Sequence, residues 1–103
     1  MPGKPKDPPS KGHGKPSIGR IVHVIGGPAV SNGADVAPAI ITRVWSKQDD
    51  RNVWTINATV FPDNGVAPAA YASSVFLYES EEAARAGRVA DTAAAAFWPS
   101  HNN

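Results

Sequence analysis

The order of apolar and polar positions along the chain predicts a series of short strands. The first is Ile18–Ile25, which is rich in β-branched residues and is ended by Gly26-Gly27-Pro28. Successive side chains of a strand point to opposite faces. Both faces of this strand are largely apolar, with Ile18, Val22 and Val24 on one and Ile21, His23 and Ile25 on the other. We therefore expect it to lie in the centre of a sheet.

Two further strands are expected from the next part of the sequence. Pro38–Trp45 starts with a proline, where the missing N–H is tolerated, and the polar turn Ser46–Asn52 follows it. The third strand alternates with a period of two, which is typical of a half-buried antiparallel strand. Its apolar side chains, Trp54, Ile56, Ala58 and Val60, are expected inside, and Thr55, Asn57 and Thr59 are expected outside.

The C-terminal part predicts one more strand, a short helix and a closing segment. Asp63-Asn64-Gly65 favours a tight hairpin turn that leads to a strand at Ala72–Glu79. Ser80 can cap a helix with an acidic first turn, and Gly87 can end that helix. Ala93–Ala96 is open to two interpretations, a second helical turn or the lead into a last strand.

These elements together predict an all-β fold, with one short helix near the C-terminus. We expect a small SH3-like antiparallel β-barrel, because closing the sheet removes its exposed edges. The barrel domain should comprise residues 17–99. Residues 1–16 are rich in Pro, Lys and Gly and have no side chains to bury, so they are expected to form a flexible arm, and residues 100–103 a tail.

Composition and charge narrow the possible functions. The chain of 103 residues has a net charge of +1, but four lysines fall in its first sixteen residues, so the rest is close to neutral. This balance disfavours a nucleic-acid partner.

The chain has no cysteine, which excludes disulfides, thiolate metal sites and a cysteine nucleophile. No apolar run approaches the roughly 20 residues that cross a bilayer, so no membrane association is expected. The N-terminus lacks a secretory signal pattern, and an intracellular start is expected.

No catalytic constellation is visible in the sequence. His23 is the one histidine inside a predicted strand, and it has no paired carboxylate or second histidine nearby. Such a residue is more often structural than a base or ligand contact. His13 and His101 fall in the expected arm and tail, so we expect no metal site and no cofactor. The sequence predicts a protein that is not an enzyme.

The aromatic and basic residues suggest a binding surface. Trp54 and Trp98 are expected to fill the core of a small barrel. Arg43 and Trp45 are two residues apart on one strand, so they share a face, and we expect that face to be exposed. A cation beside an indole can hold a flat anion or anchor a protein partner. Each arginine alone is more typical of a solvated strand charge. The candidate ligand-binding or partner-binding residues are His23, Arg43, Trp45 and Arg20.

Three segments resemble a largely uncharacterised family of small proteins encoded by bacteriophages and prophages, especially those of high-GC actinobacteria. They are Pro16–His23, Ala39–Trp45 and the ending Phe97-Trp98-Pro99. Family members share a PS-[IV]-GRIVH opening and a W-P ending. This chain differs from them in having Val24 in place of an aromatic residue and Ala96 in place of a tryptophan. The resemblance implies a phage origin and implies no reaction.

We therefore expect a phage-encoded binding protein that acts in the cytoplasm of the infected host. Its expected partner is a host protein or a small anionic ligand such as a nucleotide. The alternative is a virion component, either a capsid decoration protein or a tail-associated protein. In that case other virion proteins or further copies of the chain would be the partners, and assembly would order the N-terminal arm.

Overall fold

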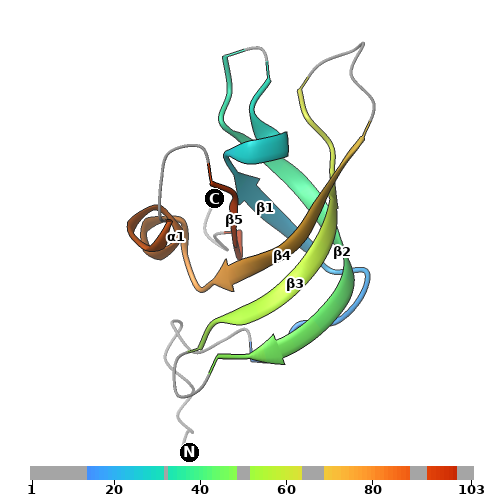
Figure 1. Cartoon of the computed structure of the whole chain (residues 1–103), viewed down its shortest axis with the longest axis vertical. Helices are drawn as coiled ribbons and strands as arrows, with labels where there is room; N and C mark the ends of the chain where they lie inside the picture. Colours follow the sequence, from blue (N-terminus) through green and yellow to red (C-terminus); the bar gives the residue numbers. More distant parts are fainter. Residues whose placement is uncertain (1–13, 32, 49–51, 64–68, 89–92, 100–103) are drawn as a thin grey trace, which may run out of the picture.

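Five strands and one helix make up the fold in the part of the chain that the structure describes (Figure 1). A computed structural model describes residues 14–31, 33–48, 52–63, 69–88 and 93–99. The elements in order are β1 (Ile21–Ile25), the 3₁₀ turn η2 (Gly27–Ala29), β2 (Val36–Lys47), β3 (Trp54–Val60), β4 (Ala70–Tyr78), α1 (Glu81–Gly87) and β5 (Ala95–Phe97).

The five strands form a closed barrel in the order β1-β2-β3-β4-β5. The expected small all-β barrel is therefore confirmed. Four of the five strand pairs are antiparallel, including the pair of β1 with β5. The β4–β5 pair is parallel, with Leu77 opposite Ala96, so the expectation of a wholly antiparallel barrel is wrong there. The reason is the connection through α1, which returns the chain so that β5 runs beside β4 in the same direction.

Strand β1 begins three residues later than the sequence predicts. The Arg20 amide donates a hydrogen bond to the Ser17 carbonyl at 3.2 Å, which closes a turn. Gly19 lies within this turn with a φ of 95°, in the left-handed region that glycine adopts without steric cost. Ile18 is therefore exposed in the turn and does not share the inner face of the strand with Val22 and Val24.

The two apolar faces of β1 contact two separate parts of the core. Val22 and Val24 lie inside the barrel in the main cluster of buried side chains. Ile25, on the other face, packs with Phe97 of β5 and Ala84 of α1 in a second cluster. Strand β1 pairs with β2 on one side and β5 on the other, as each strand of the closed barrel has two neighbours, and Ile21 on its outer face is exposed.

The barrel interior is filled by aliphatic side chains and one indole. Strand β3 follows the predicted alternation inward, and Trp98 is buried in the main cluster as expected. Trp54 lies at the start of β3 and is only partly buried against this cluster. The main cluster comprises Val22, Val24, Ala29, Ala37, Ala39, Ile41, Ile56, Ala58, Val60, Ala72, Val75, Leu77, Ala96 and Trp98.

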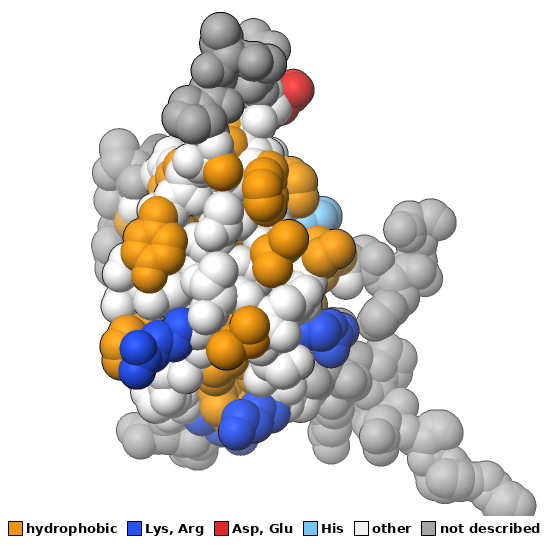
Figure 2. Space-filling view, turned by 90° about the vertical axis from the view of Figure 1, so that its right-hand side faces the viewer, with side chains coloured by type: hydrophobic (Ala, Val, Ile, Leu, Met, Phe, Trp, Pro, Cys, Tyr) orange, Lys and Arg blue, Asp and Glu red, His pale blue; other side chains and the backbone are white. Residues whose placement is uncertain are grey.

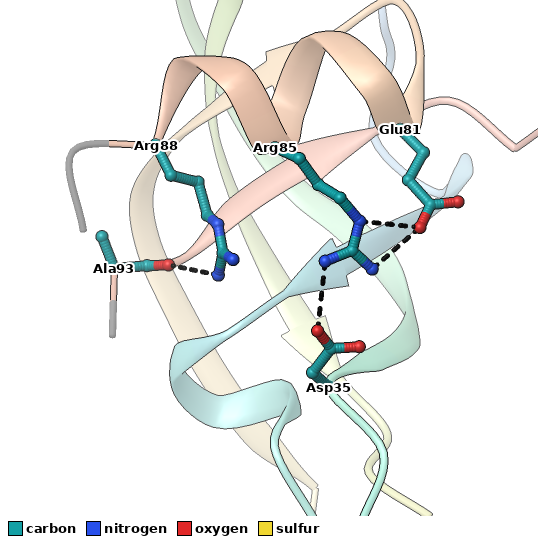
Figure 3. Close-up of polar contacts among 5 residues, drawn as sticks. All are labelled: Asp35, Glu81, Arg85, Arg88 and Ala93. Carbon is teal, nitrogen blue, oxygen red and sulfur yellow. Dashed lines mark hydrogen bonds and ion pairs between the residues drawn. The ribbon is translucent and has the colours of Figure 1, made fainter. Parts of the chain in front are cut away.

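Helix α1 covers the barrel beside β5 and is fixed at both ends. The Ser80 hydroxyl accepts a hydrogen bond from the Ala83 amide at 3.1 Å, which is the predicted cap. The helix ends at Gly87 as expected, where an added Cβ would come within 2.5 Å of the Tyr78 hydroxyl. Figure 3 shows the Arg88 guanidinium donating to the Ala93 carbonyl, which ties the helix end to the segment that leads into β5.

A short ion-pair network ties α1 to the start of β2 (Figure 3). The Arg85 Nη1 atom lies 3.1 Å from Asp35 Oδ2, and its Nη2 atom lies 2.8 Å from Glu81 Oε2, one turn back on the helix. The hydrogen bond from Arg85 lowers the pKa of the Asp35 carboxyl below its ordinary value. All three side chains are exposed, so the network positions the helix more than it stabilises the fold.

The remaining sequence expectations have mixed outcomes. Strand β2 is longer than predicted, and β4 begins two residues earlier. Of the two interpretations of Ala93–Ala96, the lead into a last strand is the observed one. Most of the expected arm, the predicted Asn64-Gly65 turn and the tail lie outside the described residues. Pro16 is fully buried, so the packed part of the fold includes the last position of the expected arm.

The buried position of Ile56 predicts a large effect of its truncation. Ile56→Ala should lower the free energy of unfolding by about 2–5 kcal/mol, because it leaves a cavity in the main cluster. Thr55→Ala, its neighbour on the outer face, should change stability much less. Chemical denaturation of the two variants measures this difference. Equal effects would show that β3 does not present Ile56 to the core.

The Asp35–Arg85 pair predicts an acid-dependent contribution to stability. A carboxyl with a lowered pKa stabilises the folded state when it is ionised, and this contribution is lost as the pH falls below about 4. Asp35→Asn should therefore melt slightly below the parent at neutral pH, and the two melting temperatures should converge in acid. Glu82→Gln, a change at an exposed acid of the same helix, is the control. A difference that stays constant with pH would contradict the role of the charge.

Candidate functional site

Four side chains form a connected cluster on the outer face of β2, β3 and β4. Figure 2 views one side of the barrel, on which apolar side chains are spread and basic side chains gather toward the lower part. The cluster comprises Arg43 and Trp45 of β2, Asn57 of β3 and Tyr71 of β4, and we name it the Trp45 cluster. It is held together by direct contacts between these side chains.

Irregular pairing of β2 with β3 places Trp45 over the sheet. The register of the two strands shifts twice, between Ile41 and Arg43 and between Val44 and Ser46. Trp45 is the unpaired residue of the second shift, and Arg43 lies directly opposite Asn57. A β-bulge re-aims the side chains around it. Here it lets the indole reach across the sheet, where its Nε1 atom donates a hydrogen bond to Asn57 Oδ1 at 2.9 Å.

Asn57 is the buried polar centre of the cluster. Its side chain is on the outer face of β3, as expected, yet the residue is only 6% exposed because its neighbours cover it. Its Oδ1 atom also accepts a hydrogen bond from the Ser74 amide at 2.7 Å, and its Nδ2 atom donates to the Tyr71 hydroxyl at 2.8 Å. A buried amide with these partners is satisfied and fixed in orientation.

Strand β4 also bulges opposite Asn57. Ile56 pairs with Val75 and Ala58 pairs with Ala72, so two residues of β4, Ser73 and Ser74, face one residue of β3. Ser74 has a φ of 56°, which is unfavourable for a residue with a side chain. Its hydrogen bond to Asn57 holds the bulge closed. The bulges of β2 and β4 therefore both depend on the same amide.

Arg43 rests on the indole with its hydrogen-bonding capacity unused. Its guanidinium carbon lies 3.9 Å from the centre of the Trp45 ring, within cation–π distance. Trp45 is 48% exposed, so both side chains lie on the solvent-facing side of the strand, as expected. Among the residues that the structure describes, Arg43 has no salt bridge or hydrogen bond through its side chain. Its donors are available to an acceptor from solution.

Tyr71 supplies a second donor to the cluster. The residue is 61% exposed. Its hydroxyl oxygen accepts the hydrogen bond from Asn57, which leaves the hydroxyl hydrogen free to donate. The cluster thus combines a fixed cation, a hydroxyl donor and two aromatic surfaces. This combination suits a carboxylate or phosphate that is attached to an apolar or planar group.

The other two candidate residues lie apart from this cluster. The Arg20 guanidinium lies 5.1 Å from the centre of the Trp98 ring, at an end of the barrel. His23 packs edge-on against Phe97, with ring centres 5.4 Å apart. It pairs across the sheet with Pro38, about 17 Å along β2 from Arg43. The structure brings Arg43 and Trp45 together and leaves Arg20 and His23 with other partners.

The role of Asn57 is not predicted by the pattern of β3. The alternation of β3 places it outside, where an asparagine needs no partner, and its burial follows from bulges in two other strands. The occurrence of an asparagine inside a predicted strand is itself a signal, because asparagine is depleted in strands. An asparagine between Ile56 and Ala58 therefore indicates a side chain with a specific bonding role.

Other kinds of site find no support in the described ranges. Within them, no three His, Cys, Asp or Glu side chains are grouped closely enough to hold a metal ion. Nor is any helix there both long and apolar enough to span a membrane. Comparison with protein-family models, with curated proteins and with solved structures finds no match to the chain.

Removal of the Asn57 side chain should loosen the cluster. Asn57→Ala leaves the Ser74 amide and the Trp45 indole without their acceptor, which should cost about 1–3 kcal/mol of folding stability. The fluorescence emission of Trp45 should shift to the red as the indole becomes more solvated. Thr59→Ala, on the same face of the same strand, is the control and should change neither property appreciably. An unchanged melting curve for Asn57→Ala would contradict the central role of the amide.

Proposed function

We propose that this protein is a non-catalytic binding protein of phage origin that acts on a component of the infected cell. The observation that carries the proposal is the stacking of Arg43 on a half-exposed Trp45. Exposed tryptophan, arginine and tyrosine are the residues that most often dominate binding energy at protein surfaces. The Trp45 cluster presents all three on one sheet face.

The fixed geometry of the cluster supports a binding role. A flexible surface side chain loses conformational entropy when a partner immobilises it. Arg43 and Trp45 are already held by their mutual contact and by the bond from the indole to Asn57. Binding of a partner to this surface therefore causes a smaller loss of side-chain conformational entropy.

The chemical nature of the cluster favours binding over catalysis. A general base or nucleophile must exchange a proton near neutral pH. The cluster contains no His, Asp, Glu or Lys, the side chains that most often take this role. Its donors and aromatic surfaces can hold an anionic group in place, which is what a binding protein requires. The proposed phage origin is supported by the resemblance of Pro16–His23, Ala39–Trp45 and Phe97–Pro99 to phage and prophage proteins.

The double variant Arg43→Ala with Trp45→Ala tests the proposal. Both side chains are exposed, so the variant should fold and melt cooperatively, with only a modest loss of stability. Affinity capture from an actinobacterial host lysate, read by mass spectrometry, compares its partners with those of the parent. The change in melting temperature on addition of each of a panel of nucleotides tests for small anionic ligands. Binding seen with the parent should be lost or strongly reduced in the variant.

A second double variant controls for a general loss of surface charge and aromatic area. Lys47→Ala with Phe76→Ala removes an exposed cation from β2 and an exposed aromatic residue from β4, outside the Trp45 cluster. This control should retain all partners. If the cluster variant folds and also retains all of them, the proposed surface is wrong.

A further inference from the structure

The Trp45 cluster is one end of a wider apolar surface. Ile21 of β1 lies opposite Ile40 of β2, Ile40 opposite Thr59 of β3, and Thr59 opposite Tyr71 of β4. Residues that are directly opposite on neighbouring strands share a face, so these four form one row across the outside of the barrel. We name it the outer row. Ile21 is 57% exposed and Ile40 is 37% exposed, which is unusual for neighbouring isoleucines.

Tyr71 joins the outer row to the Trp45 cluster. It ends the row on β4, and its hydroxyl bonds to Asn57 of the cluster. Phe61 extends the apolar surface at the other end of β3, since its amide bonds to the Pro38 carbonyl and its side chain is exposed. The outer row and the Trp45 cluster therefore extend together over four strands, β1 to β4. Four adjacent strands span about 14 Å of surface.

The shape of this surface favours a large partner. Small ligands are held in concave pockets that bury most of their surface. Within the described part of the chain, a small pocket opens between β4, α1 and the segment before β5, and none of its lining residues belongs to the Trp45 cluster or the outer row. A sheet face of this kind instead contacts the surface of another macromolecule.

The distribution of charge favours a protein over a nucleic acid. The described residues contain six lysines and arginines and five aspartates and glutamates, a difference of one. A nucleic-acid partner requires several cations that contact successive phosphates. Arg43 is the one cation of the Trp45 cluster. Within the described residues its guanidinium has no ion-pair partner, and such a group beside an apolar row matches a carboxylate beside apolar side chains.

We infer that the partner of this face is a protein segment that carries a carboxylate next to exposed apolar side chains. Burial of the guanidinium under a partner without an acceptor would be costly, and a carboxylate can take two of its parallel N–H donors. The outer row provides the apolar contact area beside that ion pair. This inference rests on the proposed binding function and names the class of partner.

Selection from a random peptide library displayed on yeast tests the inference with the full-length protein. The enriched peptides should carry Asp or Glu beside aromatic or aliphatic residues. For a synthetic peptide of the enriched sequence, fluorescence anisotropy should show roughly tenfold weaker binding to Arg43→Ala. Ile40→Ser should weaken binding by a similar factor, because it removes apolar contact area of the outer row. Lys47→Ala and Phe76→Ala should bind within about twofold of the parent.

Other outcomes overturn the inference and separate it from the proposed function. If no acidic peptide is enriched, or if Ile40→Ser binds as the parent does, the class of partner is wrong. Binding of an oligo(dT) probe or a nucleotide through Arg43 and Trp45 would also show that the class of partner is wrong. The proposed binding function would then still hold. Self-association in sedimentation velocity that is lost in Ile40→Ser would identify a second copy as the occupant. Retention of all binding by the Arg43→Ala and Trp45→Ala double variant would refute the assignment of the binding surface to the Trp45 cluster, on which both the proposed function and this inference rest.

Discussion

Closure of the barrel through three residues of β5 is the constraint on which the remaining structure depends. Ala95–Phe97 pair with β1 on one side and with β4 on the other, so one short segment satisfies two strand edges. Helix α1 and its bonds to Asp35 and Ala93 hold this segment in place. Helix α1 lies against β5 and the end of β4, and no α-helix among the described elements covers the outer face of β2 and β3 (Figure 1).

The uncovered face is shaped by one buried amide. Asn57 accepts from strand β2 through Trp45 and from strand β4 through Ser74, so it fixes the bulges of both neighbours of β3. The arrangement stores some backbone strain at Ser74 and holds a tryptophan half out of the protein. Both features are costly for stability alone. They are consistent with a surface whose geometry serves recognition.

The barrel can be predicted from the sequence, but only two of the four residues of the Trp45 cluster, Arg43 and Trp45, can. The alternation of β3 and the cap at Ser80 each depend on a few neighbouring residues. Both are therefore visible in the sequence, and both are observed in the structure. The shared exposed face of Arg43 and Trp45 is also a local property of one strand. The burial of Asn57 and the parallel pairing of β5 depend on register between distant strands. A register shift of one residue, as in the bulges of β2 and β4, cannot be predicted from the alternation of apolar and polar residues.

The closed barrel has a consequence for how this surface can evolve. In the outer row, Ile40 of β2 and Thr59 of β3 each pair with a strand on both sides, so no strand can be added there by backbone pairing. Recognition at this face is thus carried by side chains alone. Ile21 and Ile40 are exposed and lie outside both core clusters, so substitutions there should change folding stability little. The chemistry of this face can therefore change with little effect on the barrel that carries it.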